Sequence, residues 1–207
     1  MTQRTVDWVL FDFGGVMAEE GFREGLRFLA VHHGRDPEAV LAHAMDAVYA
    51  SGYVTGTGRE AAFWRELGER AGLWPDPLAA ESAILSRFRL RPWMLDWVRR
   101  LRAAGLGVGL LTDQTDWLER LDRRDGFLSE LDRVYNSFRL GKGKRDPTLF
   151  DDVAADLGVA PERVLFLDDA PGNVERARER GLRAVEFTGQ AEAERILGEL
   201  TGVEGPD

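Results

Sequence analysis

Hydrophobic and polar positions along the chain form short apolar runs separated by stretches with a helical repeat. The first apolar run covers residues 6–11, is rich in β-branched and aromatic side chains, and is stopped by an Asp-Phe-Gly-Gly sequence that begins at Asp12. Short apolar runs bounded by turn residues are typical of buried strands. The pattern therefore predicts a strand that runs directly into a turn.

From about residue 19 to residue 90, apolar residues recur only at helical spacing. Asp36 precedes Pro37, and this pair is typical of a helix start because the aspartate caps the first turn and proline tolerates the first position. Three helices are expected in this stretch, over residues 37–50, 58–71 and 77–88. The sequence predicts an all-helical insertion, residues 19–90, into a domain formed by residues 1–18 and 91–207.

After residue 92, strand and helix patterns alternate. Strands are expected over residues 106–111, 133–135, 164–167 and 184–187, and helices over residues 93–104, 117–123, 147–157 and 173–180. Such alternation predicts the α/β class, with a mostly parallel, Rossmann-like sheet covered on both faces. Ligands of such sheets bind beyond the carboxyl ends of the strands. Three predicted strands end there in polar residues, namely Asp12, Thr112 and the pair Asp168 and Asp169.

The composition and net charge of the chain limit the classes of molecule that it is expected to bind. The chain has 207 residues, 36 acidic and 27 basic side chains, a formal net charge of −9, and no cysteine. The acidic balance argues against nucleic acid or an anionic membrane as a partner, and the absence of cysteine excludes disulfides and thiolate chemistry. No apolar run approaches the roughly 20 residues of a membrane span, and residues 1–4 lack a secretory signal pattern. We expect a cytoplasmic protein, whose oligomeric state the sequence does not indicate.

The acidic strand ends indicate a metal site. Carboxylates gathered at one edge repel each other, by about 4 kcal/mol for a pair 4 Å apart at an effective dielectric of about 20. Mg²⁺ offsets this repulsion, since it prefers oxygen ligands and is bound by one or two carboxylates together with a substrate phosphate. Thr112 offers a hydroxyl and Lys144 a positive charge to a phosphoryl group. An aspartate beside the phosphorus can attack it and form an aspartyl-phosphate.

Four segments resemble, in order, the motifs of the haloacid dehalogenase-like (HAD) phosphohydrolases. They are VLFDFGGV at residues 9–16, LLTD at 110–113, SFRLGKGKRDP at 137–147 and VLFLDDAPGN at 164–173. The resemblance covers nearly the whole chain and implies a HAD-like core with a helical cap between the first two motifs. It implies that Asp12 is the nucleophile and that Thr112 and Lys144 bind the phosphoryl group of a small phosphorylated metabolite.

The same resemblance implies where magnesium binds. Its ligands would be Asp12, the carbonyl oxygen of Gly14, and Asp169, with Asp168 binding directly or through water. In the third motif Lys142 competes with Lys144, and we prefer Lys144 because it stands just before the Asp-Pro pair that opens the next helix. An arginine replaces the first proline of the family's pattern there.

One position departs from the family's phosphatases, which usually carry a second aspartate two residues after the nucleophile as general acid and base. Here that residue is Gly14. General acid–base catalysis is worth ~10²–10⁴ in rate. Candidate substitutes are Glu19, Glu20 and Asp113, which the sequence does not rank. Two alternatives stay open: a haloacid dehalogenase-type hydrolase, which needs no metal, and a non-catalytic phosphate-binding protein with the same fold.

Overall fold

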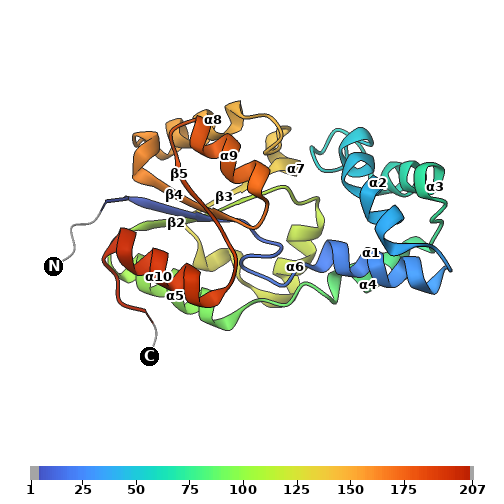
Figure 1. The fold of residues 1–207 in the computed structure, drawn as a ribbon, viewed down its shortest axis with the longest axis horizontal. Helices are drawn as coiled ribbons and strands as arrows, with labels where there is room; N and C mark the ends of the chain where they lie inside the picture. The colour runs from blue at the N-terminus through green and yellow to red at the C-terminus, as the bar shows by residue number, and fades with distance from the viewer. Residues whose placement is uncertain (1–4, 206–207) are drawn as a thin grey trace.

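The computed structural model describes residues 5–205. Residues 1–4, on which the prediction about a secretory signal rests, lie outside this range. Five parallel strands of the described chain form one sheet in the order β3-β2-β1-β4-β5 (Figure 1). The strands are β1 Trp8–Phe11, β2 Gly107–Thr112, β3 Arg133–Asn136, β4 Val164–Asp168 and β5 Arg183–Glu186. Each lies where the pattern predicts it.

The register of the central strands fixes the position of their polar ends. β1 lies between β2 and β4, and Phe11 is paired with Leu110 on one side and Leu167 on the other. The backbone N–H of Asp12 donates to the carbonyl oxygen of Leu167 at 2.9 Å. Asp12 therefore lies level with Asp168, and the carboxyl ends of the three central strands meet at one edge.

Helices cover both faces of the sheet. Successive strand residues point to opposite faces, so Leu10 belongs to one buried cluster and Phe11 to the other. On the Leu10 side lie α8 (Thr148–Leu157) and α9 (Pro171–Glu179), and on the Phe11 side lie α5 (Pro92–Ala103), α6 (Trp117–Asp125) and α10 (Gln190–Thr201) (Figure 1). Shorter turns connect them: α7 Ser137–Leu140, η1 Leu128–Glu130 and η2 Pro161–Arg163. α10 is not among the elements expected from the pattern.

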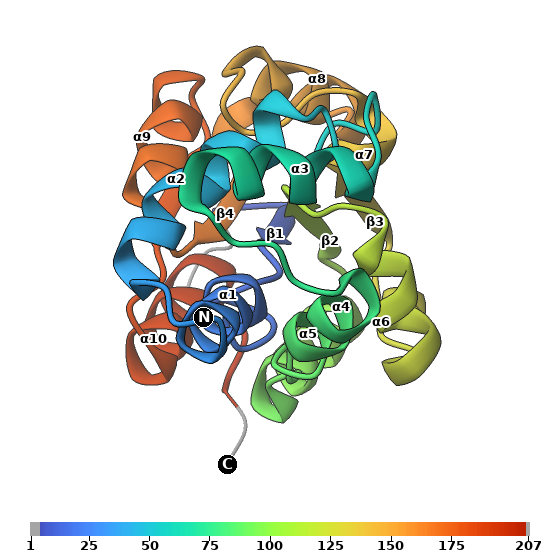
Figure 2. The same ribbon diagram turned by 90° about the vertical axis from the view of Figure 1, so that its right-hand side faces the viewer.

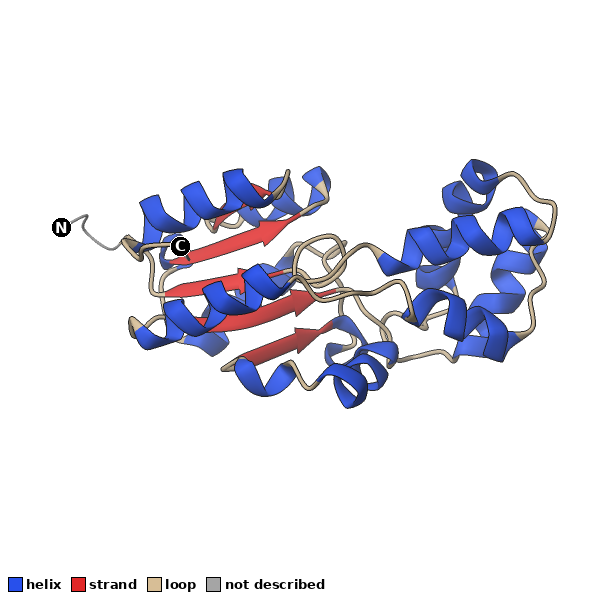
Figure 3. Cartoon of the chain, turned by 90° about the horizontal axis from the view of Figure 1, so that it is seen from below, coloured by secondary structure: helices blue, strands red, loops and turns tan. Residues whose placement is uncertain are grey.

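Residues 19–90 contain four helices, and we call them the four-helix segment. The helices are α1 Gly21–His32, α2 Pro37–Ala50, α3 Glu60–Ala71 and α4 Pro77–Leu85. The side chains of Asp36 and Asp76 accept hydrogen bonds from the first turns of α2 and α4, which confirms the predicted helix starts. Figure 3 shows the strands pointing toward this segment, and Figure 2 shows it in front of their carboxyl ends.

Hydrogen bonds hold the four-helix segment against the loops at the strand ends. The hydroxyl of Ser137 donates to the carbonyl oxygen of Val54 at 2.8 Å. The hydroxyl of Tyr53, in the loop after α2, donates to the carboxylate of Asp116. These bonds place the segment directly over the edge where the polar strand ends meet. Within residues 5–205, no helix has the length and apolar character needed to cross a membrane.

Candidate active site

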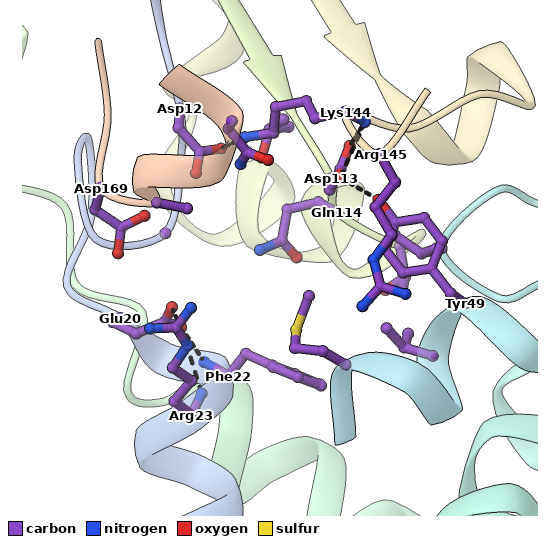
Figure 4. A pocket seen from close by; sticks show the side chains of 18 of the residues that line it. Asp12, Glu20, Phe22, Arg23, Tyr49, Asp113, Gln114, Lys144, Arg145 and Asp169 are labelled. Carbon is purple, nitrogen blue, oxygen red and sulfur yellow. Dashed lines mark hydrogen bonds and ion pairs between the residues drawn. The ribbon is translucent and has the colours of Figure 1, made fainter. Parts of the chain in front are cut away.

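A cavity of about 160 Å³ lies between the carboxyl ends of the strands and the four-helix segment. Its walls include most of the site residues expected from the sequence, namely Asp12, Gly14, Thr112, Lys144 and Asp169. The segment contributes Glu20, Phe22 and Arg23 on the opposite side, and Tyr49 beside Asp113 (Figure 4). The structure thus brings together side chains that lie far apart in the sequence.

Lys144 is buried between two carboxylates. Its Nζ lies 3.0 Å from Oδ1 of Asp12 and 2.5 Å from Oδ2 of Asp168. Burial alone would lower the pKa of Lys144, but the two carboxylates outweigh it and raise this pKa above its usual range, so the ammonium stays charged. Lys142, by contrast, is not among the residues that line the cavity, and it binds Asp152 at 2.5 Å. The structure places Lys144, not Lys142, beside Asp12.

Three carboxylates converge at this point. Oxygen atoms of Asp12, Asp168 and Asp169 all lie within 4.8 Å of one another. The pKa of Asp12 is raised to about 7, chiefly by burial and in part by Asp168 and Asp169, against the opposing effects of Lys144 and the Thr112 hydroxyl. Burial and Asp168 also raise the pKa of Asp169. This mutual repulsion is what a divalent cation with oxygen ligands would relieve.

The two neighbouring aspartates have different surroundings. Asp168 accepts hydrogen bonds from Lys144, from the backbone N–H of Ala170 at 2.8 Å, and from the side-chain amide of Asn173 at 3.1 Å. Its lone pairs are therefore largely used within the protein. Asp169 is half-buried and points into the cavity (Figure 4). Asp169 is thus better placed than Asp168 to bind a cation directly.

The turn after Asp12 leaves room for the carboxylate of Asp169. Gly15 has a φ of +86°, and a Cβ on it would lie 2.4 Å from Oδ2 of Asp169. Only glycine permits both the conformation and the close approach. No N–H or O–H group of residues 5–205 donates to the carbonyl oxygen of Gly14. Gly14 lines the same cavity as Asp12 and Asp169, and a carbonyl oxygen beside carboxylates is the kind of donor that Mg²⁺ prefers.

Several contacts that hold the site together were not expected from the sequence. Asp113 accepts two hydrogen bonds from the backbone N–H of Lys144, at 2.9 and 3.1 Å, and another from the hydroxyl of Tyr49. The guanidinium of Arg176 donates to the carbonyl oxygen of Lys144 at 2.8 Å and to Asn173 at 2.6 Å. Asn173 lies within the fourth motif, but its contact with Asp168 has no signal in the pattern.

Comparisons with known proteins agree with this geometry. A family model described as haloacid dehalogenase-like hydrolase matches residues 6–198. Phosphoserine phosphatase of Thermus thermophilus is 31% identical over 197 residues, covering 86% of this chain and 79% of that protein. Bifunctional epoxide hydrolase 2 of Rattus norvegicus is 30% identical over 132 residues, covering 60% of this chain but 23% of that protein. The chain thus matches about a quarter of the length of the rat enzyme.

Solved structures show the same fold at low sequence identity. The HAD family enzyme bt-2542 of Bacteroides thetaiotaomicron is 21% identical with a TM-score of 0.73, covering 93% of this chain and 99% of that chain. The same enzyme has been solved in complex with magnesium and inorganic phosphate. An L-2-haloacid dehalogenase of Xanthobacter autotrophicus is 18% identical with a TM-score of 0.64, covering 95% and 84% of the two chains. These likenesses confirm the predicted α/β fold.

Proposed function

This chain belongs to the haloacid dehalogenase-like hydrolases, and we propose that it is a magnesium-dependent phosphatase acting on small phosphorylated metabolites. The observation that carries the proposal is Lys144, buried between Asp12 and Asp168, with Asp169 completing a cluster of three carboxylates in one cavity. A buried cation beside a carboxylate nucleophile suits the transfer of an anionic group. The cavity volume of about 160 Å³ favours a small substrate.

In the proposed reaction, Asp12 attacks the phosphorus atom. The bond from phosphorus to the leaving oxygen breaks as an aspartyl-phosphate forms, and water then hydrolyses this intermediate to release phosphate. Lys144 and the hydroxyl of Thr112, both next to Asp12, hold the oxygens of the transferring group. The raised pKa of Lys144 keeps its ammonium charged throughout the neutral range, so this support does not depend on pH there.

The residues of the cluster would hold the metal. We assign Asp12, Asp169 and the Gly14 carbonyl oxygen as ligands, with Asp168 binding directly or through water while it anchors Lys144. Bound there, Mg²⁺ would neutralise the carboxylates and the substrate phosphate so that the two can approach.

The four-helix segment would act as the cap over this site. Residues 1–18 and 91–207 then form the core domain and residues 19–90 the cap domain. Glu20, Phe22 and Arg23 of the segment face the strand ends across the cavity, and Tyr49 lines it beside Asp113. A cap in this position excludes water from the reacting groups and contacts the part of the substrate that differs between metabolites. Substrate choice would therefore depend on these side chains.

A carbon–halogen hydrolase is the second candidate function. Gly14, in place of the aspartate usual in the phosphatases, and the structural likeness to a dehalogenase favour it. Such an enzyme would release halide from a haloacid, and a chelator would leave its rate unchanged. The three converging carboxylates favour the metal-dependent phosphatase.

The test is hydrolysis of a panel of phosphomonoesters by the purified protein, with Mg²⁺ and with EDTA. We expect turnover that needs Mg²⁺ and that Asp12→Asn abolishes together with the aspartyl-phosphate. Lys144→Met should lower kcat/KM by about 10²–10³-fold, as removal of a donor from an electrostatic site does. Lys142→Met, on the same loop but outside the cavity, is the matched control and should retain activity. Hydrolysis that survives in Asp12→Asn would refute the proposal.

A further inference from the structure

The proposed reaction needs a proton donor that Gly14 does not supply. The leaving oxygen must gain a proton, and the water that hydrolyses the aspartyl-phosphate must lose one. A Cβ on residue 14 would lie 3.1 Å from Cε1 of Phe88, 3.6 Å from Oε1 of Glu20 and 3.7 Å from Nε2 of Gln114. Of these three neighbours, Glu20 is the one that ionises. Its carboxyl group borders the space in which an aspartate at position 14 would begin.

Glu20 is fixed in this position by the start of α1. Its Oε1 accepts hydrogen bonds from the backbone N–H groups of Phe22 at 3.0 Å and Arg23 at 3.3 Å. Its Oε2 has a looser ion pair with Nε of Arg23, at 3.7 Å. The helix thus holds one oxygen of Glu20, while the carboxyl lines the cavity that contains Asp12 and Asp169 (Figure 4).

The other two candidate substitutes are engaged elsewhere. Both oxygens of Asp113 accept hydrogen bonds from the backbone of Lys144, and one accepts from Tyr49 as well. Glu19 is half-exposed and pairs with Arg91 at 3.4 Å, on the outer side of the segment. Glu19 is not among the residues that line the cavity around Asp12. The place of Glu20 in the cavity, next to position 14, therefore singles it out.

The surroundings of Glu20 act on its pKa in opposite directions, with a net upward shift. Burial raises the pKa of Glu20 above its usual range, and Asp169 adds to this, whereas Arg23 and the two backbone N–H groups oppose it. On its outer side the nearby charged groups are Glu24 of the same helix and the arginines at positions 87, 89 and 91. A carboxyl group that retains a proton closer to neutral pH is better suited to act first as an acid and then as a base.

We propose that Glu20 is the general acid and general base of this site, a role that rests on the proposed phosphatase function. As the bond between phosphorus and the leaving oxygen breaks and Asp12 becomes phosphorylated, Glu20 donates its proton to that oxygen. Glu20 then accepts a proton from the water that attacks the aspartyl-phosphate. Phosphate leaves, and Asp12 and protonated Glu20 are restored. The acid is thus supplied from the cap side of the cavity.

The leaving group makes the role testable in Glu20→Gln, which keeps an oxygen to cap α1. An alkyl phosphomonoester needs a proton on its leaving oxygen, whereas p-nitrophenyl phosphate does not. We expect kcat/KM for the alkyl substrate to fall by about 10²-fold or more. With p-nitrophenyl phosphate we expect a full burst of nitrophenolate, then slow turnover with Asp12 trapped as the aspartyl-phosphate. A merely structural role would lower the burst and both rates alike.

A second pair of variants tests the same role if Glu20→Gln folds poorly. Glu20→Asp and Glu20→Asn both cap a helix well and differ in one ionisable group. We expect the aspartate variant to turn over the alkyl substrate at least about tenfold faster than the asparagine variant. Glu19→Gln should match the wild type in every assay.

Equal rates for the Glu20→Asp and Glu20→Asn variants, or equal losses on both substrates, would overturn the role of Glu20 and leave the phosphatase function standing. If the wild type hydrolyses no phosphomonoester, the function fails and the role fails with it.

Discussion

At the scale of single residues, Gly15 determines how closely Asp169 can approach the turn after Asp12. Its positive φ and its missing Cβ let the Asp169 carboxylate lie against the turn after Asp12. Gly15→Ala should strain the backbone and displace that carboxylate. We expect the Mg²⁺ concentration needed for half-maximal activity to rise at least about tenfold, measured by titration of the rate with Mg²⁺.

A matched control separates backbone strain from the loss of the metal site. Gly34 also has a positive φ, of +63°, but a Cβ there would meet no atom within 4 Å. Gly34→Ala should therefore lower stability by about 1 kcal/mol and leave the Mg²⁺ titration unchanged. Similar titrations for the two variants would contradict the role given to Gly15.

The raised pKa of Asp12 predicts how the stability of the metal-free protein varies with pH. Its folded pKa of about 7 lies above the ordinary value of 3.8, so folding favours its protonated form. The stability that this group contributes is complete below pH 3.8 and is lost as the pH rises through 7. We expect the unfolding free energy in EDTA to fall between pH 5 and pH 8, at no more than about 1.4 kcal/mol per pH unit.

Urea denaturation at the two pH values checks this expectation. Asp12→Asn removes the titrating group, so its unfolding free energy should change less between these pH values than that of the wild type. Saturating Mg²⁺ should reverse the fall in the wild type, because a cation favours the ionised carboxylates. A wild-type protein that becomes more stable in EDTA as the pH rises through 7 would show that Asp12 is not desolvated in this way.

The sequence located the candidate side chains at the strand ends better than the residues that support them. Asp12, Thr112 and Asp168 could be predicted because parallel strands bring their carboxyl ends to one edge. Glu20 could be named but not ranked, since its distance from Gly14 depends on how α1 packs against the core. The role of Arg176 could not be predicted, because a hydrogen bond to a backbone carbonyl does not depend on a recognisable spacing of residues in the sequence.

At the scale of elements, the loop after α2 joins the four-helix segment to the core. Tyr53 donates a hydrogen bond to Asp116, which also pairs with Arg120 at 2.9 Å. Tyr53→Phe removes one such bond and should cost about 1 kcal/mol. If the segment is a cap that closes over the site, we expect faster amide exchange in residues 51–59 and a several-fold fall in kcat/KM.

A matched control for Tyr53→Phe is the same substitution at Tyr135, on the Leu10 side of the sheet. The hydroxyl of Tyr135 donates to Asp156 at 2.6 Å, and Tyr135 packs in the core cluster of the opposite face. Tyr135→Phe should cost a similar free energy of unfolding and leave exchange in residues 51–59 and kcat/KM unchanged. If both variants alter exchange in that loop equally, the effect reflects global stability rather than closure.

The elements that the pattern missed or misplaced have physical explanations. α10 has buried residues at Ala193, Ile196 and Leu197, a helical spacing that its many charged neighbours obscure. α4 was expected to run toward residue 88 but ends at Leu85. The chain turns there, and Phe88 packs against Phe13 with ring centroids 5.4 Å apart. Tertiary packing thus overrides helix propensity at this end.

At the scale of the whole molecule, the site lies between two parts of the chain that are far apart in sequence. Core and four-helix segment both line the cavity, so a ligand bound there contacts both. A ligand at about 100 times its Kd stabilises the folded state by about 2.7 kcal/mol. For a chain of this size each kcal/mol raises Tm by about 2–4 °C.

Magnesium and inorganic phosphate should therefore raise Tm together more than the sum of their separate effects. Phosphate alone meets three carboxylates within 4.8 Å of one another, and their charge repels it although Lys144 is close by. The cation neutralises that charge, so each ligand strengthens the binding of the other. Thermal melts with each ligand and with both would measure this, using Asp169→Asn as the variant that should lose the cooperative part. A full shift with phosphate alone, or an equal shift in Asp169→Asn, would mean that these carboxylates do not hold the metal.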